Sequence, residues 1–137
     1  MSRDTRTGGV MENMIFPALK QGGYQWRTQV KIGRRPGGGR HIVDAIATKD
    51  GCLILVSSKW QEVSGTAEAK VPWEVICLIA ALESQDYERA YLILGGPGWS
   101  LRRFFTEGGL RQYINGSENV HIVTLEDFVA KANQSKL

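Results

Sequence analysis

Apolar residues along the chain follow two spacings, one typical of helices and one typical of strands. Apolar side chains recur every three or four residues over 11–19 and predict a first helix. Strand-forming residues recur at every second position over 24–33 and predict a strand. Two further apolar runs, over 40–47 and 52–59, predict the next strands, and the Asp-Gly pair between them is typical of a hairpin turn.

The second half of the chain alternates helices with strands. A long helix is expected in two pieces, because Pro72 suits the first turn of a helix better than its interior. The residues over 90–94 are all apolar, which predicts a central strand covered on both faces. Helical segments over 99–105 and 110–114, a strand over 120–123 and a closing helix complete the order. The expected apolar face of the long helix comprises Val75, Ile76, Leu78, Ile79 and Leu82.

The order α-β-β-β-α-β-α-β-α predicts an α/β fold. We expect an αβββαβ core with a central mixed sheet flanked by helices, plus a C-terminal helix–strand–helix. A single domain is expected over 1–137, because the chain has ordinary domain length and shows neither an internal repeat nor a boundary. The polar residues 1–8 are expected to be flexible.

The composition is that of a soluble globular protein with a mild basic excess. The net charge is +3 and 42% of the residues are hydrophobic. This excess favours an anionic partner, although solubility explains it equally well. Cys52 and Cys77 have no partner at zinc-ligand spacing and fit a reducing, cytoplasmic setting. No apolar run approaches the length of a membrane span, so no membrane association is expected.

Two of the predicted strands carry a charged residue among apolar ones. Asp44 is expected to share a strand face with Ile42 and Ile46, and Lys59 has the same parity as Leu55. If these faces are buried, both charges must be paired or must bind a metal. An acid and a lysine on adjacent strands can hold a divalent cation and position a water molecule, which suits phosphodiester hydrolysis. A plain ion pair at a strand end is the alternative.

The order of these elements, with Asp44 on the second strand and Lys59 at the end of the third, resembles the PD-(D/E)XK nuclease superfamily. The resemblance covers roughly residues 8–95. The superfamily pattern is an aspartate, a variable gap and then acid-x-lysine; Asp44 matches the first position and Lys59 the last. The resemblance implies a restriction-endonuclease-like fold in which Asp44 and a second acid bind the metal and Lys59 assists the attacking water.

The chain departs from this pattern where Ser57 replaces the acid before x-Lys. Some restriction enzymes of the superfamily have Ser-x-Lys and take the second acid from the following helix. The resemblance therefore implies that Glu74 or Glu68 takes part, and Glu74 is the isolated charge in an otherwise apolar stretch. The alternatives are a first-turn acid favoured by the helix dipole for Glu74 and a solvated helix-start residue for Glu68.

Two further polar residues match tendencies of the superfamily. Gln61 follows the lysine by two places and could hold a phosphate or a water, and Glu12 stands in the first helix, where many of these nucleases carry another acid. A surface glutamine and a solvated helical face are the alternatives. The predicted catalytic residues are Asp44, Lys59, Glu74, Ser57 and Gln61, and the predicted metal ligands are Asp44, Glu74, Glu68 and Glu12.

Basic residues gather in two places that suit a nucleic acid. The first surrounds the predicted turn over 34–40, where a flexible basic loop can follow a phosphate backbone. The second follows the glycine turn over 95–98, at the carboxyl end of a buried strand, where ligands often bind. A solvated turn is the alternative for the first. The predicted nucleic-acid contacts are Arg27, Lys31, Arg34, Arg35, Arg40, Arg102 and Arg103.

These features together lead us to expect a metal-dependent DNA endonuclease of the restriction, homing or phage type. The expected cofactor is Mg²⁺, with Mn²⁺ as a possible substitute, and the expected substrate is double-stranded DNA. A chain with one active site would cut both strands as a homodimer or higher assembly. The alternatives are a catalytically inactive nucleic-acid-binding module, motivated by Ser57, a junction resolvase, and a ribonuclease on the same fold.

Overall fold

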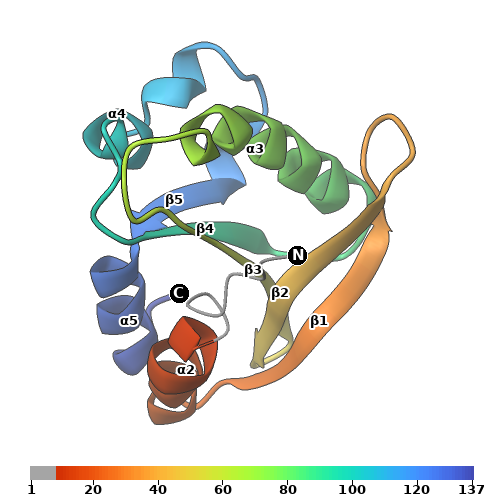
Figure 1. The fold of residues 1–137 in the computed structure, drawn as a ribbon. Coiled ribbons are helices and arrows are strands. Elements are labelled where there is room, and N and C mark those ends of the chain that lie inside the picture. Colours follow the sequence, from red (N-terminus) through yellow and green to blue (C-terminus); the bar gives the residue numbers. More distant parts are fainter. Residues whose placement is uncertain (1–8) are drawn as a thin grey trace.

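The computed structural model describes residues 9–137, whose strands form one five-stranded mixed sheet in the order β1-β2-β3-β4-β5 (Figure 1). β1, β2 and β3 pair antiparallel, whereas β3, β4 and β5 pair parallel. The α/β fold with a mixed sheet and flanking helices is therefore confirmed. The expected flexibility of residues 1–8 lies outside the described residues. The strands are β1 (Gln25–Arg34), β2 (Arg40–Lys49), β3 (Cys52–Trp60), β4 (Arg89–Gly95) and β5 (Val120–Thr124).

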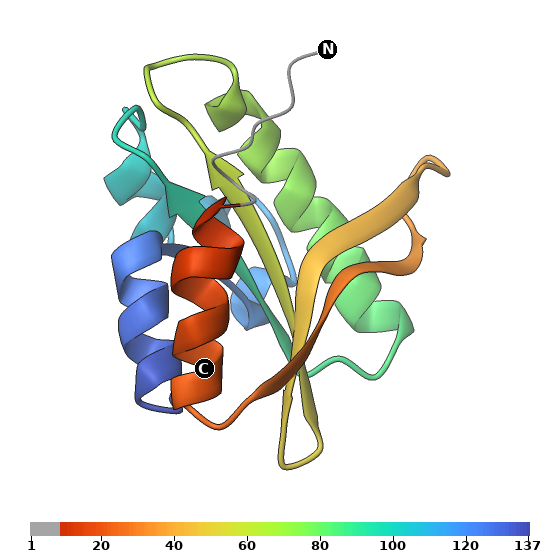
Figure 2. The ribbon, with the colours of Figure 1, turned by 60° about the horizontal axis from the view of Figure 1, so that its bottom comes forward.

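Helices cover both faces of the sheet (Figure 2). α2 and α5 lie side by side on one face, and α3 crosses the other. No helix in the described part of the chain is long and apolar enough to cross a membrane. The helical elements are η1 (Met11–Ile15), α2 (Phe16–Gln21), α3 (Ala67–Ser84), α4 (Arg102–Thr106), η2 (Gly109–Gln112), η3 (Ser117–Asn119) and α5 (Leu125–Asn133).

Two hydrophobic cores lie on opposite faces of the sheet, and β3 and β4 contribute to both. Leu55 packs beneath α3, whereas Ile54 and Val56 pack toward α2 and α5, as alternation along a strand requires. β4 is buried over most of its length and lies between β3 and β5. Its prediction as a covered central strand is confirmed.

α3 is one continuous helix, so the expected break at Pro72 is wrong. Proline removes one hydrogen bond to the preceding turn. The helix continues past it because Val71, Val75 and Leu78 bury an apolar stripe against the sheet. Ile76, expected on that stripe, instead lies on the outer side of the helix with 39% of its surface exposed.

The β1–β2 hairpin bends sharply at one position, where Gln29 has φ of +50°. Non-glycine residues rarely adopt this left-handed conformation, and in a strand it interrupts the regular alternation of side chains. Trp26 packs in the core beside α2, whereas Val30 packs in the core beneath α3. Strand alternation would keep both on one face, so the hairpin changes face between them.

β2 changes face at the same level, beside Asp44. Val43 packs beneath α3, but Ala45 packs in the opposite core. Ile42 is 43% exposed, whereas Ile46 is buried, so the expectation that these two residues share one face with Asp44 is wrong. Asp44 therefore lies at the bend of the hairpin rather than within a flat, regular strand.

Candidate active site

Asp44 is held against the backbone of β3 by the geometry of this bend. Regular pairing between β2 and β3 reaches Ala45 opposite Val56 and goes no further. Beyond that pair, the backbone N–H of Ser58 donates to Oδ2 of Asp44 at 2.7 Å, and the Ser58 hydroxyl lies at 3.4 Å from the same oxygen. The carboxylate thus replaces the carbonyl that a continued ladder would have offered to Ser58.

The surroundings of Asp44 shift the pKa of its carboxyl group. Burial raises the pKa of the carboxyl group, and this effect outweighs the hydrogen bonds from Ser58, the positive charge of Lys59 and a hydrogen bond from Gln29. The charge of Lys59 thus acts to lower the pKa of Asp44. A nearby divalent cation would lower this pKa further and so oppose the effect of burial.

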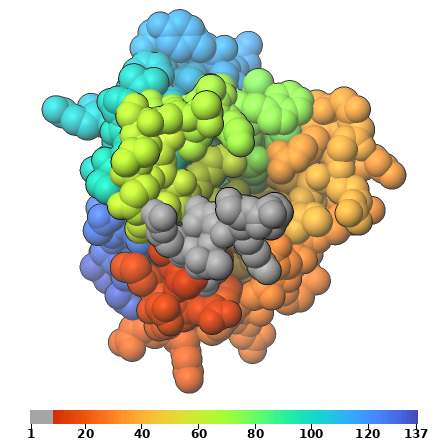
Figure 3. Space-filling view, viewed as in Figure 1, coloured from red at the N-terminus to blue at the C-terminus, as the bar shows by residue number. Residues whose placement is uncertain are grey.

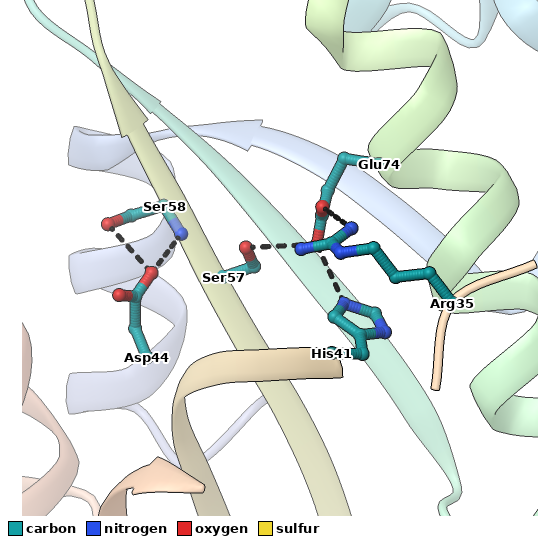
Figure 4. A network of polar contacts seen from close by, with 6 residues as sticks. All are labelled: Arg35, His41, Asp44, Ser57, Ser58 and Glu74. Carbon is teal, nitrogen blue, oxygen red and sulfur yellow. Dashed lines mark hydrogen bonds and ion pairs between the residues drawn. The ribbon is translucent and has the colours of Figure 1, made fainter. Parts of the chain in front are cut away.

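Glu74 of α3 lies at the centre of a buried polar cluster. Its Oε1 accepts a hydrogen bond from Nη1 of Arg35 at 2.7 Å, and its Oε2 lies 3.1 Å from Nε2 of His41 and 3.4 Å from the Ser57 hydroxyl. An ionised carboxylate can only accept, so Nε2 of His41 is the donor. We call Glu74, Arg35, His41 and Ser57 the Glu74 cluster (Figure 4).

The Glu74 carboxylate is held firmly in its charged form. Burial alone would raise its pKa, but the hydrogen bonds from His41 and Arg35 and the charge of Arg35 lower the pKa to about 2. Glu74 is only 4% exposed, so these partners compensate a charge that water barely reaches.

Two adjacent residues of β3 contact the two acids: Ser57 contacts Glu74, and Ser58 contacts Asp44. In Figure 4, Ser57 lies toward Glu74, whereas Asp44 and Ser58 lie on the other side of the β3 ribbon. The helix-borne acid therefore reaches Ser57, the position at which the superfamily pattern has its own acid. Sequence analysis did not assign a functional role to His41. Its parity with Val43, which faces α3, is the signal that could have placed it there.

The other predicted site residues have different surroundings. Oε1 of Gln61 accepts from the backbone N–H of Ala67 at 3.0 Å, and its Nε2 donates to the carbonyl of Gly98 at 2.9 Å. Glu68 accepts from the backbone N–H of Ser100 at 2.6 Å and from its hydroxyl at 2.8 Å. These contacts join the start of α3 to the loop after β4, and we call them the α3 joint.

The four predicted metal ligands do not form one cage. Glu68 belongs to the α3 joint, Glu12 is exposed on η1, and Figure 4 shows Asp44 and Glu74 on either side of β3. Within residues 9–137, no three acidic, histidine or cysteine side chains gather in a way that could hold a metal ion. Asp44 and Glu74 flank the motif strand, and both oxygens of Glu74 already have partners.

The predicted nucleic-acid contacts lie on two elements. On the hairpin, Arg34 and Arg40 face each other across the strands, and Nη1 of Arg34 donates to the carbonyl of Gly38 at 2.7 Å. At α4, Arg102 donates to the carbonyl of Gly96 at 2.9 Å. The hairpin lies beside α3 on the face drawn in Figure 3. The remaining predicted contacts are exposed on β1 or α4: Arg27, Lys31 and Arg103.

Comparison with known protein families assigns the chain to one of them. The profile of a PD-(D/E)XK nuclease superfamily domain matches residues 3–136, which is almost the whole chain. The chain therefore belongs to the PD-(D/E)XK nuclease superfamily. Nucleases of this superfamily act on nucleic acids and generally use divalent metals.

A solved structure shares the fold. The crystal structure of a protein of unknown function, AF1548, superposes with a TM-score of 0.51 at 12% sequence identity. The match covers 80% of this chain and 54% of that protein, so the chain spans about half the length of its structural neighbour. No curated protein matches the sequence.

Proposed function

We propose that the protein is a metal-dependent DNA endonuclease with Asp44, Lys59 and Glu74 at its active site. The observation that carries the proposal is the position of Glu74, whose carboxylate reaches Ser57 at 3.4 Å. That contact supplies an acid beside the motif strand, next to the residue that replaces the motif's own acid. Asp44 and Lys59, which match the remaining motif positions, interact electrostatically nearby.

The chemistry of these donors fits magnesium. Mg²⁺ prefers hard oxygen ligands and is commonly held by one or two carboxylates, with water and phosphate completing its shell. Asp44 would supply one of those carboxylates. Glu74, which lies on the other side of β3 and is paired with Arg35, would supply the second only after it leaves this arrangement. A bound magnesium ion would polarise the scissile phosphate and lower the pKa of a bound water.

The residues of the chain have separate tasks in this proposal. Lys59 orients the attacking water and stabilises the charge that develops on the phosphate. The backbone N–H of Ser58 fixes one oxygen of Asp44, so the carboxylate keeps a single orientation. His41, buried inside β2, orients Glu74 through Nε2. Gln61 does not touch the reacting groups. It accepts a hydrogen bond from the first residue of α3 and so holds in place the helix that carries Glu74.

Double-stranded DNA is the proposed substrate, and the basic hairpin is its proposed contact. Each arginine or lysine that neutralises a phosphate releases counterions and contributes affinity that salt weakens. Arg27, Lys31, Arg34 and Arg40 are exposed along the hairpin and are available for such contacts. A homodimer would bring two such sites to the two strands of a duplex.

The direct test is cleavage of plasmid and linear duplex DNA by the purified protein, with Mg²⁺ and with chelator. We expect Mg²⁺-dependent cutting by the wild type and a loss of about a thousandfold in Asp44→Asn and in Lys59→Ala, because each removes charge that the transition state needs. Asp50→Asn, on the exposed β2–β3 turn, is the matched control and should cut normally. Cutting that persists in both site variants would contradict the proposal.

A second candidate function is an inactive nucleic-acid-binding module. Ser57 carries no charge, and the carboxylate beside it is already paired with Arg35 and His41. This candidate predicts DNA binding without Mg²⁺-dependent cutting in any variant. Parallel assays on four-way junctions, single-stranded DNA and RNA distinguish a junction resolvase or a ribonuclease from a duplex endonuclease.

A further inference from the structure

Arg35 reaches the Glu74 cluster from the turn between β1 and β2, which is closed by hydrogen bonds from the Arg35 N–H to the Gly39 carbonyl at 2.6 Å and from the Gly38 N–H to the Arg35 carbonyl at 2.9 Å. The turn between β1 and β2 contains Gly37 and Gly38, which have φ of +92° and +106°. A Cβ added at Gly37, Gly38 or Gly39 would meet nothing within 4 Å. The three glycines that follow Arg35 therefore extend away from the rest of the protein, on an exposed turn.

The guanidinium of Arg35 occupies one of the two oxygens that a metal ion would need. Arg35 lies 2.7 Å from Oε1, while His41 and Ser57 lie against Oε2. Oε2 already has two partners, so a divalent cation would have to bind at Oε1, where the guanidinium 2.7 Å away would repel it. In this arrangement Glu74 is therefore closed to a metal ion.

Arg35 and His41 differ in their ability to leave. The Arg35 side chain is 26% exposed and comes from the exposed turn between β1 and β2. The His41 side chain is 1% exposed and belongs to β2. Movement of His41 would disturb the sheet and the core around Val43. Movement of the Arg35 side chain breaks its contacts with Glu74 and Cys77 but leaves the pairing of the sheet intact. Arg35 is the exchangeable partner, and His41 is the fixed one.

We propose that Arg35 is exchanged between Glu74 and a backbone phosphate of bound DNA, so that Glu74 opens to the metal only when nucleic acid is in place. This inference rests on the proposed nuclease function and adds its regulation. Phosphate is a suitable competitor, because arginine binds it through paired, charge-assisted hydrogen bonds. Arg34 and Arg40 face each other at the strand ends that flank this turn, so they can attract DNA phosphates close to Arg35.

The first half of the proposal is tested on the free protein, without DNA, by titration with Mn²⁺ followed by electron paramagnetic resonance. If Arg35 blocks Glu74 for nine-tenths of the time or more, Arg35→Gln should bind Mn²⁺ about tenfold more tightly than the wild type. Arg35→Lys keeps a cation and should remain weak. Arg34→Gln is the matched control, because Arg34 bonds to Gly38 rather than Glu74.

The double variant Arg35→Gln/Glu74→Gln shows where the gained ion binds. We expect the gain to disappear, because the ligand that Arg35 had blocked is gone. Equal Mn²⁺ affinity in the wild type and Arg35→Gln, or a gain that survives in the double variant, would overturn the proposal.

The transfer of Arg35 from Glu74 to a DNA phosphate is tested on the wild type. The side-chain nitrogen resonances of Arg35 in the ¹⁵N-labelled wild type report its ion pair, and a short blunt DNA duplex is titrated in without metal. We expect the Arg35 resonances to shift as DNA binds. The side-chain nitrogen resonances of His41 should stay unchanged, because His41 keeps its hydrogen bond to Glu74. Bound DNA with unchanged Arg35 signals would overturn the exchange alone. A protein that does not bind the duplex would overturn the DNA function and the exchange, while the Mn²⁺ titration would still report the block at Glu74.

Discussion

Two acids of the same helix, Glu68 and Glu74, are both fully engaged, yet they serve different purposes. Glu68 lies at the start of α3 and accepts hydrogen bonds from the neutral backbone and hydroxyl groups of Ser100. Glu74 lies further along, is buried, and is paired with Arg35 and His41. The partner of Glu68 belongs to the loop after β4. One partner of Glu74, Arg35, belongs to the exposed turn between β1 and β2.

The difference shows what separates a structural carboxylate from one available for function. Hydrogen bonds from Ser100 lower the pKa of Glu68. Loss of these hydrogen bonds would separate the start of α3 from the loop after β4. The pKa of Glu74 is lowered to about 2 by Arg35 and His41, although burial by itself would raise it. In our proposal Arg35 is the partner that leaves. An exchangeable cationic partner, more than the carboxylate itself, marks the candidate site.

The sharpest way to break the comparison is to neutralise each acid in turn. Glu74→Gln should lower the rate of DNA cleavage by about a hundredfold, because it removes a charge needed at the reacting phosphate. Glu68→Gln keeps its shape at the α3 joint and should leave the cleavage rate within about threefold of the wild type, with a lower thermal midpoint. Single-turnover cleavage rates measure both. Equal losses in the two variants would contradict this division of roles between the two acids.

Acid unfolding sharpens the comparison for Glu74. A carboxyl group whose pKa falls on folding, here from the ordinary value near 4.5 to about 2, stabilises the protein above pH 4.5 and loses that contribution as the pH falls toward 2. A shift of this size corresponds to about 3 kcal/mol of unfolding free energy at most.

Urea unfolding from pH 6 to pH 2 compares the wild type with Glu74→Gln. The difference between the two proteins should be largest above pH 4.5 and shrink on acidification. Because Asp44 is present in both proteins, its raised pKa, which favours the folded state at low pH, cancels in the difference. A difference that does not change with pH would contradict the assignment of the shift to Glu74.

The smallest effect on activity is expected at the α3 joint. A Cβ at Gly98 would lie 2.5 Å from the backbone of Val63, so Gly98→Ala must displace the chain there. Overpacking of this kind costs about 1–3 kcal/mol of stability. We expect a lower thermal midpoint with cleavage retained at a temperature where the protein is folded. Gly39→Ala, where a Cβ meets nothing within 4 Å, is the control and should leave the midpoint unchanged.

The sequence predicts the fold well because each element carries its own local signal. The alternating residues over 24–33, the Asp-Gly hairpin turn and the apolar run of β4 give strands, and their order implies the mixed sheet. The bend at Gln29 has no such signal, since a left-handed glutamine in a strand depends on the packing of both cores. The interruption expected at Pro72 was wrong for a related reason, because burial of Val71 and Val75 outweighs the lost hydrogen bond.

The candidate site was predictable only in part. Asp44, Lys59 and Ser57 follow from a motif of short range, and Glu74 follows from its isolation in an apolar helix. The partners of Glu74 could not be predicted, because Arg35 and His41 reach it from the hairpin through long-range contacts that no local spacing encodes. Gln61 was predicted from its spacing from Lys59, and Glu68 as the alternative acid after the motif, but the structure engages both in the α3 joint.

The proposed site can be located by anomalous diffraction from Mn²⁺, in crystals of Lys59→Ala grown with a DNA duplex so that the strand stays intact. We expect a Mn²⁺ peak with carboxylate oxygens of Asp44 and Glu74 at about 2.1 Å, and with Arg35 turned from Glu74 to a phosphate. Bound DNA with Mn²⁺ remote from both carboxylates, or with Arg35 still paired to Glu74, would contradict it.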